Sequence, residues 1–283
     1  MNHAILLISC PDQKGITASV TGFVYKHNGN IIDADQHIDE QSNTFFMRLE
    51  WSLAEFSLSE EKIKEAFRPL AERFGMQWEI SFSEKVQRVA IFVSKPLHCL
   101  YDLLIRRKAG QLNCEFPLII SNHHEAGAVA EDFGIKFVEI PITPKNKSIE
   151  EKRQLKLLQE FKVDLIVLAR YQQILSPHFV GALPAKIINI HHSFLPAFPG
   201  SQPYAQAYRK GVKVIGATSH FVTEKLDEGP IIEQDTVRVS HRDSLEDLIR
   251  KGEDLEKVVL NRALRWALEK KILCYDNKTV VFA

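Results

Sequence analysis

Three polar side chains in the second half of the chain have the types and spacing needed to act on a carbonyl group. Asn189 and His191 lie two residues apart at the end of a short apolar strand. Asp227 follows thirty-six positions after His191, just before Gly229-Pro230. Because side chains two apart on a strand face the same side, the amide and the imidazole could together hold a carbonyl oxygen. A nearby carboxylate could activate the nucleophile. The pattern predicts acyl-group chemistry.

Each of these residues also admits a structural interpretation. Asn189 could be a turn residue that binds its own backbone, His191 a structural histidine, and Asp227 a solvated loop carboxylate. His192 suggests a metal site, but neighbouring strand side chains point apart and no further ligand is placed to complete one. The run from His123 to Glu125 lacks the H-E-x-x-H spacing. We therefore expect no metal and no cofactor.

The elements that would position these residues begin near residue 89. Short strands rich in Val and Ile alternate there with helical patterns, which predicts a Rossmann-like, mostly parallel sheet covered on both faces. In such sheets ligands bind beyond the carboxyl ends of the strands, where Asn189 and His191 would lie. The expected strands are 89–93, 115–120, 136–140, 163–168, 186–190, 214–222 and 231–239, and the expected helices begin at residue 97 or span 126–133, 148–161 and 245–270.

Residues 1–83 have the pattern of a separate domain. Apolar alternation and helical spacing predict the order βαββαβ, a ferredoxin-like fold, in which Asn28-Gly29 ends the first helix. Pro69 should kink or split the second helix. Residues 84–88 form a polar linker, and residues 89–283 form the second domain of this α/β protein.

The composition excludes several classes of function. The chain of 283 residues has 36 basic and 36 acidic side chains, and 45% of its residues are hydrophobic. It carries no polybasic patch for nucleic acid, no apolar run of about eighteen residues for a membrane span, and no signal peptide. Its four cysteines have no C-x-x-C spacing. We expect buried, reduced thiols and a cytoplasmic protein without nucleic-acid or membrane partners.

Residues 88–283 resemble the formyltransferase family, which handles 10-formyltetrahydrofolate. The resemblance is carried, in the same order as in the family, by ISNHHEAG, LARYQQILSPHFV, NIHHSFLPAFPG, GATSHFVTEKLDEGPIIEQ and the final helix. It implies that Asn189, His191 and Asp227 are the catalytic set. It also implies folate contacts from two loops, with Gln173, Ile174, Leu175, Val222 and Gly229 as the expected residues. Core packing is the alternative for Ile174 and Leu175.

The segment CPDQKGITASVTGFVYKHNGNIIDADQ resembles an ACT domain, a module that senses small ligands. The resemblance implies an amino-acid effector near Asp12, Gly15, Asn28 and Asn30. It also implies a homo-oligomer, a dimer or a tetramer, because such units commonly pair. The alternative is that the domain only joins subunits.

Departures from the family pattern narrow the expected activity. Transferases that act on glycinamide ribonucleotide have a Gly-rich phosphate loop after the first strand, whereas residues 92–104 contain no glycine and include Pro96. Methionyl-tRNA and sugar formyltransferases favour an Arg-Gly pair where Pro199-Gly200 stands. The chain instead resembles the members that hydrolyse 10-formyltetrahydrofolate to formate and tetrahydrofolate, which supplies purine synthesis and balances one-carbon pools.

Two other functions stay open at this point, a phosphoribosylglycinamide formyltransferase and a non-catalytic amino-acid sensor. Lys95, His98 and Cys99 are expected where an amine acceptor would bind, with a surface or core position as the alternative. The sequence does not reveal why such a site would admit water and exclude an amine.

Overall fold

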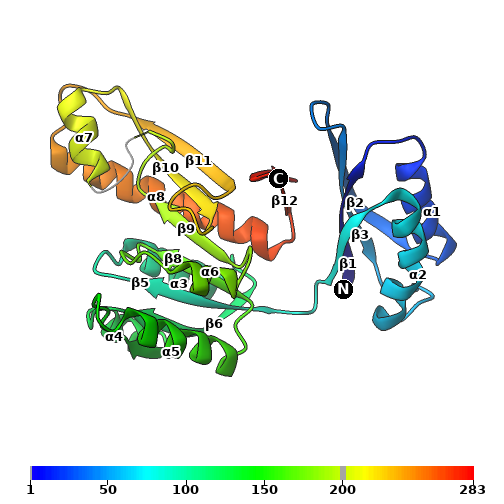
Figure 1. Cartoon of the computed structure of the whole chain (residues 1–283), viewed down its shortest axis with the longest axis horizontal. Coiled ribbons are helices and arrows are strands. Elements are labelled where there is room, and N and C mark those ends of the chain that lie inside the picture. The colour runs from blue at the N-terminus through cyan, green and yellow to red at the C-terminus, as the bar shows by residue number, and fades with distance from the viewer. Residues whose placement is uncertain (1, 198–201) are drawn as a thin grey trace. The chain divides into compact units, whose positions relative to one another are not determined.

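The computed structural model describes residues 2–197 and 202–283, so the expected departure at Phe198-Pro199-Gly200 lies outside the described residues. The chain divides into two units, residues 1–86 with 269–283, and residues 87–268. Each unit is described below by itself (Figure 1).

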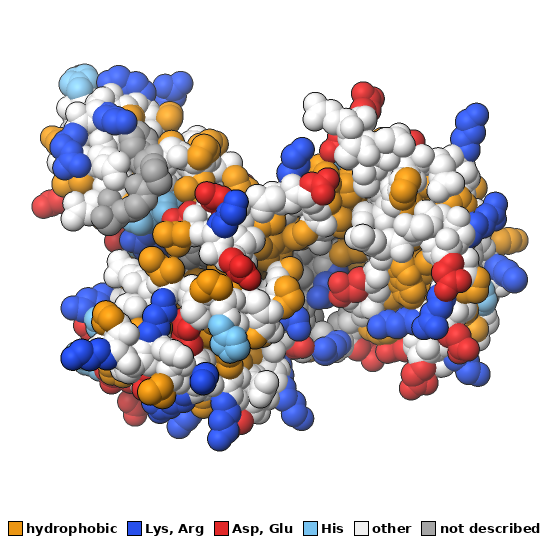
Figure 2. Space-filling model, in the orientation of Figure 1, with side chains coloured by type: hydrophobic (Ala, Val, Ile, Leu, Met, Phe, Trp, Pro, Cys, Tyr) orange, Lys and Arg blue, Asp and Glu red, His pale blue; other side chains and the backbone are white. Residues whose placement is uncertain are grey.

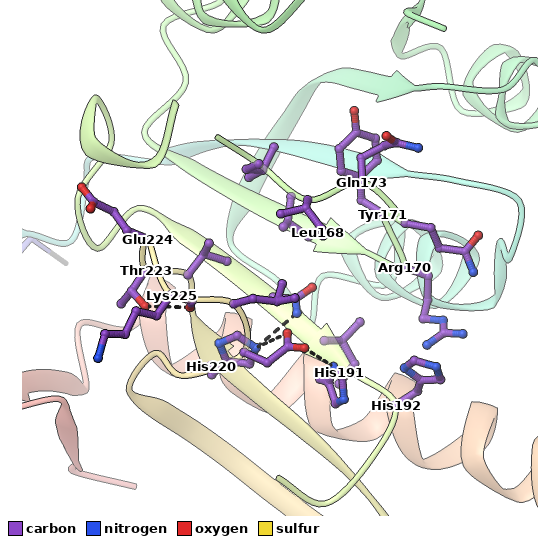
Figure 3. A pocket seen from close by; sticks show the side chains of 18 residues that line it. Leu168, Arg170, Tyr171, Gln173, His191, His192, His220, Thr223, Glu224 and Lys225 are labelled. Atoms are coloured by element: carbon purple, nitrogen blue, oxygen red, sulfur yellow. Dashed lines mark hydrogen bonds and ion pairs between the residues drawn. The ribbon is translucent and has the colours of Figure 1, made fainter. Parts of the chain in front are cut away.

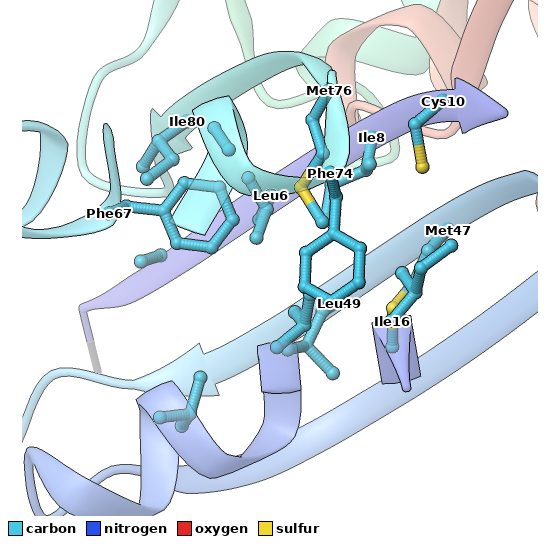
Figure 4. Packing of buried hydrophobic residues seen from close by; sticks show 14 of the residues in the cluster. Leu6, Ile8, Cys10, Ile16, Met47, Leu49, Phe67, Phe74, Met76 and Ile80 are labelled. Carbon is cyan, nitrogen blue, oxygen red and sulfur yellow. The ribbon is translucent and has the colours of Figure 1, made fainter. Parts of the chain in front are cut away.

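Unit 1 is a four-stranded antiparallel sheet with two helices. Its elements are β1 (His3–Pro11), α1 (Ile16–Lys26), β2 (Asn30–Asp39), β3 (Thr44–Ser52), α2 (Glu60–Phe74) and β4 (Gln77–Phe82), with strand order β2-β3-β1-β4. This is the predicted βαββαβ order. Alternate residues of β1, such as Leu6 and Ile8, are buried with Ile16 of α1 and Phe67 of α2 (Figure 4). The period-two pattern of β1 therefore builds the core of this unit.

Pro69 does not split α2, contrary to one of the two predicted outcomes, since the helix runs without interruption from Glu60 to Phe74. Ile63, Phe67 and Ala71 on its apolar face are buried in the core. Burial of that face outweighs the hydrogen bond that proline removes.

The last fifteen residues differ from the predicted domain boundary. The sequence assigned everything from residue 89 to 283 to one domain, whereas residues 269–283 pack with unit 1. They form the hairpin β12 (Ile272–Tyr275) and β13 (Lys278–Val281), and Phe282 is buried against Leu7 and Phe46. The reason is that the sheet of unit 1 has a second apolar face, which this hairpin covers.

Unit 2 contains the predicted Rossmann-like sheet. Its elements are β5 (Gln87–Val93), α3 (His98–Lys108), β6 (Cys114–Ser121), α4 (Ala126–Asp132), β7 (Lys136–Glu139), α5 (Lys147–Glu160), β8 (Leu165–Ala169), α6 (Pro177–Gly181), β9 (Ile187–His191), α7 (Pro203–Lys210), β10 (Val214–Phe221), β11 (Ile231–Arg238) and α8 (Leu245–Leu268). The strand order is β11-β10-β9-β8-β5-β6-β7. Strands β9, β8, β5, β6 and β7 are parallel to one another. Strand β10 pairs antiparallel with β9, and β11 pairs antiparallel with β10. Short helices α6 and α7 are two elements that sequence analysis did not predict.

Helices cover both faces of this sheet. Phe92 and Leu168 face one side and share a core with Leu158 of α5 and Phe179 of α6. On the other side α8 contacts α3 as well as strands β9, β10 and β11. Because helices bury both faces of the sheet, nearly every residue of β5 and β8 is hydrophobic.

The cysteines agree in part with the expectation from composition. On the visible face of each unit, basic and acidic side chains are interspersed (Figure 2). Within residues 2–197 and 202–283, no helix is both long and apolar enough to cross a lipid bilayer. All four cysteines are free; Cys10, Cys99 and Cys114 are buried as expected, but Cys274 is exposed because it lies on the C-terminal hairpin.

Candidate active site

The carboxyl end of β9 carries two of the three predicted catalytic residues. Asn189 and His191 alternate with Ile188 and Ile190, so they share one face of the strand. Strand β10 pairs antiparallel with β9 and places His220 opposite Asn189. The sheet itself therefore sets three polar side chains side by side.

Asp227 reaches the same place from the loop between β10 and β11. Its Oδ2 lies 3.4 Å from Nδ1 of His191, and its Oδ1 lies 3.8 Å from Nε2 of His220 (Figure 3). The aspartate has a φ of 56°, in the left-handed region that Asp tolerates better than most residues. The structure thus brings together the amide, the imidazole and the carboxylate that the sequence singled out.

The Asn189 amide has a fixed orientation. His220 Nδ1 lies 2.9 Å from the carbonyl oxygen of Phe221, so this nitrogen carries the proton and donates to that oxygen. Nε2 of the neutral ring then accepts a hydrogen bond from Asn189 Nδ2 at 3.2 Å. The second hydrogen of the amide stays available for a ligand.

One atom of His191 is conspicuous because it has no partner among the described residues. The imidazole is 6% exposed, and its Nε2 is buried without a hydrogen bond. Unsatisfied buried polar atoms are rare, and this one belongs to a residue at a cavity, where a ligand could supply the missing partner. His191 and Asn189 both line a cavity of about 360 Å³, a size suited to part of a small-molecule ligand.

The site's electrostatics favour an ionised Asp227 carboxylate beside the neutral rings of His192 and His220. Burial raises the pKa of the Asp227 carboxyl, but the hydrogen bond and the charge of His191 outweigh it and bring that pKa below its usual value. Burial lowers the pKa of His220. Burial, followed by the charge of Arg170, lowers the pKa of His192 to about 3. Asp227 is therefore an anion available as a base near neutral pH.

Four of the five expected folate residues line the cavity. Gln173, Ile174 and Leu175 come from the loop after β8, and Val222 from the end of β10. Ile174 is 60% exposed, so core packing does not account for it. Leu175, by contrast, also packs against the core of the sheet.

Gly229 does not line the cavity, contrary to expectation. A Cβ atom at this position would lie 1.8 Å from the carbonyl oxygen of Phe221. The nitrogen of Phe221 also donates to the carbonyl oxygen of Pro230, which holds the two ends of the Asp227 loop together. The glycine is needed for this close backbone approach and positions the loop from behind.

Sequence reasoning missed several residues that line the cavity. His220 on β10 lies outside both loops predicted to hold the folate, 168–175 and 222–229. Arg170, Tyr171 and residues 223–226 lie within those loops but were not singled out. The sequence predicts a β-strand at His220. That this histidine lies opposite Asn189 follows only from the register between β10 and β9. Arg170 lies in the motif LARYQQILSPHFV, but its φ of 64° and its place at the cavity could not be read from that motif.

The loop after β9 is tied down from the neighbouring strands. Thr218 Oγ1 donates to the carbonyl oxygen of Ser193 and accepts from the nitrogen of Leu195. Gln234 of β11 donates to both Thr218 Oγ1 and the carbonyl oxygen of Leu195. These bonds fix the direction in which the chain leaves His191.

The four expected effector residues lie at two ends of one helix. Asp12 and Gly15 precede α1, whereas Asn28 and Asn30 follow it. A helix of eleven residues is about 16 Å long, so the two pairs do not form one cluster within a chain. Asn28 has a φ of 59°, and its amide donates to the carbonyl oxygen of Glu55. The effector role of these residues stays a prediction.

His98, Cys99 and Glu256 place their potential ligand atoms within 4.8 Å of one another. Both carboxylate oxygens of Glu256 are already engaged, by Tyr204 at 2.5 Å and by His98 at 2.8 Å. Burial and the charge of Glu256 raise the pKa of the Cys99 thiol well above its usual value, which disfavours the thiolate that metals bind. This arrangement is a hydrogen-bonded network rather than a metal centre.

Comparisons with known proteins agree with this geometry. Models of two families match, the ACT domain over residues 4–72 and formyl transferase over residues 87–264. A formyltetrahydrofolate deformylase from Synechocystis sp. is 56% identical over 280 residues, which cover 99% of this chain and 98% of that protein. The chain belongs to the formyltetrahydrofolate deformylase family. The crystal structure of such a deformylase from Pseudomonas syringae pv. tomato superposes with a TM-score of 0.98 at 47% identity, over 100% of this chain and 95% of that one.

Transformylases match a smaller part of this deformylase-family chain. A glycinamide ribonucleotide transformylase from Symbiobacterium toebii is 30% identical, with a TM-score of 0.65, and covers 70% of this chain and 95% of its own. The end-to-end match with deformylases, ACT domain included, therefore favours the hydrolase over the transferase alternative.

Proposed function

We propose that this chain hydrolyses 10-formyltetrahydrofolate to formate and tetrahydrofolate. The observation that carries the proposal is the convergence of Asn189, His191 and Asp227 at one cavity, in a chain that matches formyltetrahydrofolate deformylases along its whole length. The folate lies along the loops that follow β8 and β10. Its formyl group reaches the end of β9.

The formyl oxygen accepts hydrogen bonds from Asn189 Nδ2 and from protonated Nε2 of His191, the atom that has no partner within residues 2–197 and 202–283. Asp227 removes a proton from water as the water oxygen bonds to the formyl carbon. The negative charge that develops on the formyl oxygen is stabilised by the two donors, each worth about 10²–10³-fold in rate. The C–N10 bond then breaks as the proton held by Asp227 passes to N10, and formate leaves after its hydroxyl proton is lost to solvent.

Formate release in the absence of any acceptor tests this function. The purified protein is incubated with 10-formyltetrahydrofolate, with and without glycinamide ribonucleotide, and formate and tetrahydrofolate are measured. We expect equal amounts of the two products, unchanged by the acceptor. Formyl transfer that requires the acceptor, with no formate released in its absence, would select the transferase instead.

We also propose that unit 1 binds an amino acid and contributes to a homo-oligomer. Supporting this, β2 is an edge strand, and its Ile32 and Ile38 are 48% and 41% exposed. Light scattering of the full chain, with formate release titrated against single amino acids, tests both points. A cytoplasmic location and the lack of any cofactor stay predictions.

A further inference from the structure

The catalytic cavity has one wall that the mechanism does not use. Arg170 and His192 line the cavity together at one end, and Thr223, Glu224 and Lys225 line it at the other, with His191 and His220 between them (Figure 3). Both ends are formed by the loops assigned to the folate, since Arg170 follows β8 and residues 223–225 follow β10. The Arg170 end adjoins His98, one of the residues expected at the space for an amine acceptor, because Arg170 and His98 both contact Glu256.

Arg170 adopts a costly backbone conformation at this wall. Its φ of 64° lies in the left-handed region, which costs a non-glycine residue about 1–2 kcal/mol. Glycine adopts this conformation without that cost, so Arg170→Gly would fit the backbone as it stands. The side chain is 13% exposed, and its Nε is 3.4 Å from Oε2 of Glu256.

Glu256 fixes the arginine from behind the wall. The carboxylate is fully buried on α8 and does not line the cavity. It also accepts hydrogen bonds from Tyr204 of α7 and His98 of α3. Burial raises the pKa of Glu256, but the hydrogen bond from His98 and the charge of Arg170 bring it below its usual value. The anion therefore persists and anchors three elements to the arginine.

Close packing completes the wall. Tyr204 lies directly on α8, since a Cβ on Gly252 would come within 2.2 Å of its ring. The ring of His192 has its centroid 5.9 Å from that of Tyr204 and 5.2 Å from that of His191. Side chains thus fill the space beside the catalytic imidazole. An approaching ammonium would also meet the guanidinium before the carboxylate behind it.

We propose that this network makes the site specific for water by excluding organic amines as formyl acceptors. It consists of Arg170, Glu256, His98 and Tyr204, and Arg170 is the member that faces Glu256 on one side and lines the cavity on the other. The proposal rests on the proposed function and answers a question the catalytic trio leaves open. Arg170 is a specificity-determining residue in this scheme. It takes no proton and forms no bond with the substrate.

The test measures how the formyl group is partitioned between water and an amine. The full-length protein is incubated with 10-formyltetrahydrofolate and excess glycinamide, and N-formylglycinamide and formate are quantified by mass spectrometry. Wild type should give formate with only background formylglycinamide. Arg170→Gly suits the left-handed backbone and opens the wall, so we expect the ratio of formylglycinamide to formate to rise about 10- to 100-fold.

Two further variants sharpen the result. Lys162→Gly is the matched control, because Lys162 is exposed, has a φ of 49° and precedes β8, whereas Arg170 follows it. It should keep the wild-type ratio and rate. Tyr204→Phe removes one bond to Glu256 but leaves the arginine, and should give a smaller rise than Arg170→Gly.

The outcomes separate this inference from the function on which it rests. Wild type that formylates glycinamide as readily as it releases formate overturns the inference, and so does the absence of any rise in every variant that keeps a cooperative melting transition. A larger rise in Tyr204→Phe than in Arg170→Gly also overturns it, since the wall would then lie elsewhere. Failure of wild type to release formate at all contradicts the proposed function instead.

Discussion

His220 lies across the sheet from Asn189, and its Nε2 accepts a hydrogen bond from the Asn189 amide at 3.2 Å. The carbonyl oxygen of Phe221 fixes the tautomer of the ring, and burial keeps the ring neutral by lowering its pKa. The direction of the asparagine amide is therefore set by a residue that need not touch the substrate. His220 is a positioning residue in the proposed mechanism.

Replacing His220 should reduce turnover without weakening folate binding. In His220→Ala the Asn189 amide can rotate away from the formyl oxygen, so we expect kcat to fall about 10- to 100-fold, less than the loss of the donor itself. KM for 10-formyltetrahydrofolate should change little. His220→Gln, whose side-chain oxygen can accept from the amide, should recover part of kcat. Steady-state kinetics check this, and equal kcat values for the two variants would contradict the positioning role.

Removing the charge of Asp227 should abolish catalysis while leaving the binding loops intact. Asp227→Asn keeps the size of the side chain but cannot accept a proton from water, so we expect kcat to fall by about 10³-fold. Folate binding, followed by fluorescence quenching, should stay within about three-fold of wild type, because the carboxylate holds no folate atom in the proposed mechanism. Glu246→Gln is the matched control, an exposed carboxylate on α8 that does not line the cavity. Rapid turnover in Asp227→Asn would remove the aspartate from the mechanism.

A methyl group at Gly229 should displace the Asp227 loop. The Cβ of Gly229→Ala would lie 1.8 Å from a backbone oxygen, which cannot move as a side chain can. We expect a loss of about 1–3 kcal/mol in the free energy of unfolding, together with lower kcat as Asp227 shifts from His191. Gly181→Ala is the control, since its Cβ would meet nothing closer than 3.8 Å. Thermal melting and kinetics on both variants are the measurement, and a Gly229→Ala protein indistinguishable from Gly181→Ala would disprove the steric account.

Local patterns in the sequence were enough to predict the elements and part of the site. Period-two alternation predicted strands of the first domain, and short runs rich in Val and Ile predicted those of the second. The alternation of side chains along a strand placed Asn189 and His191 on one face of β9. The carboxyl-end rule for parallel sheets placed them at a ligand site. The proximity of Asp227 could not come from spacing, since thirty-six residues of chain separate it from His191; it came from the resemblance to the formyltransferase family.

What the sequence could not supply depends on contacts between distant residues. The His220 pairing with Asn189 requires β10 to join antiparallel with one particular register, and that register is set by tertiary packing. The Glu256 network requires a carboxylate on the buried face of α8, where helical periodicity predicts an apolar residue. The hairpin after α8 is short, and its burial depends on an apolar face more than two hundred residues earlier in the chain.

The buried carboxylate of Glu256 should make stability fall on the acid side. Its pKa in the folded protein lies below the ordinary 4.5, so its contribution is complete above that value and is lost as pH falls through the lower, folded value. Glu256→Gln should therefore be less stable than wild type at pH 7, by about 3 kcal/mol, with a shallower decline below pH 4.5. Glu246→Gln, exposed on the first turn of the same helix, should follow the wild-type curve. Urea denaturation across this pH range measures both differences, and parallel curves for wild type and Glu256→Gln would show that the carboxylate is not the charged anchor of the network.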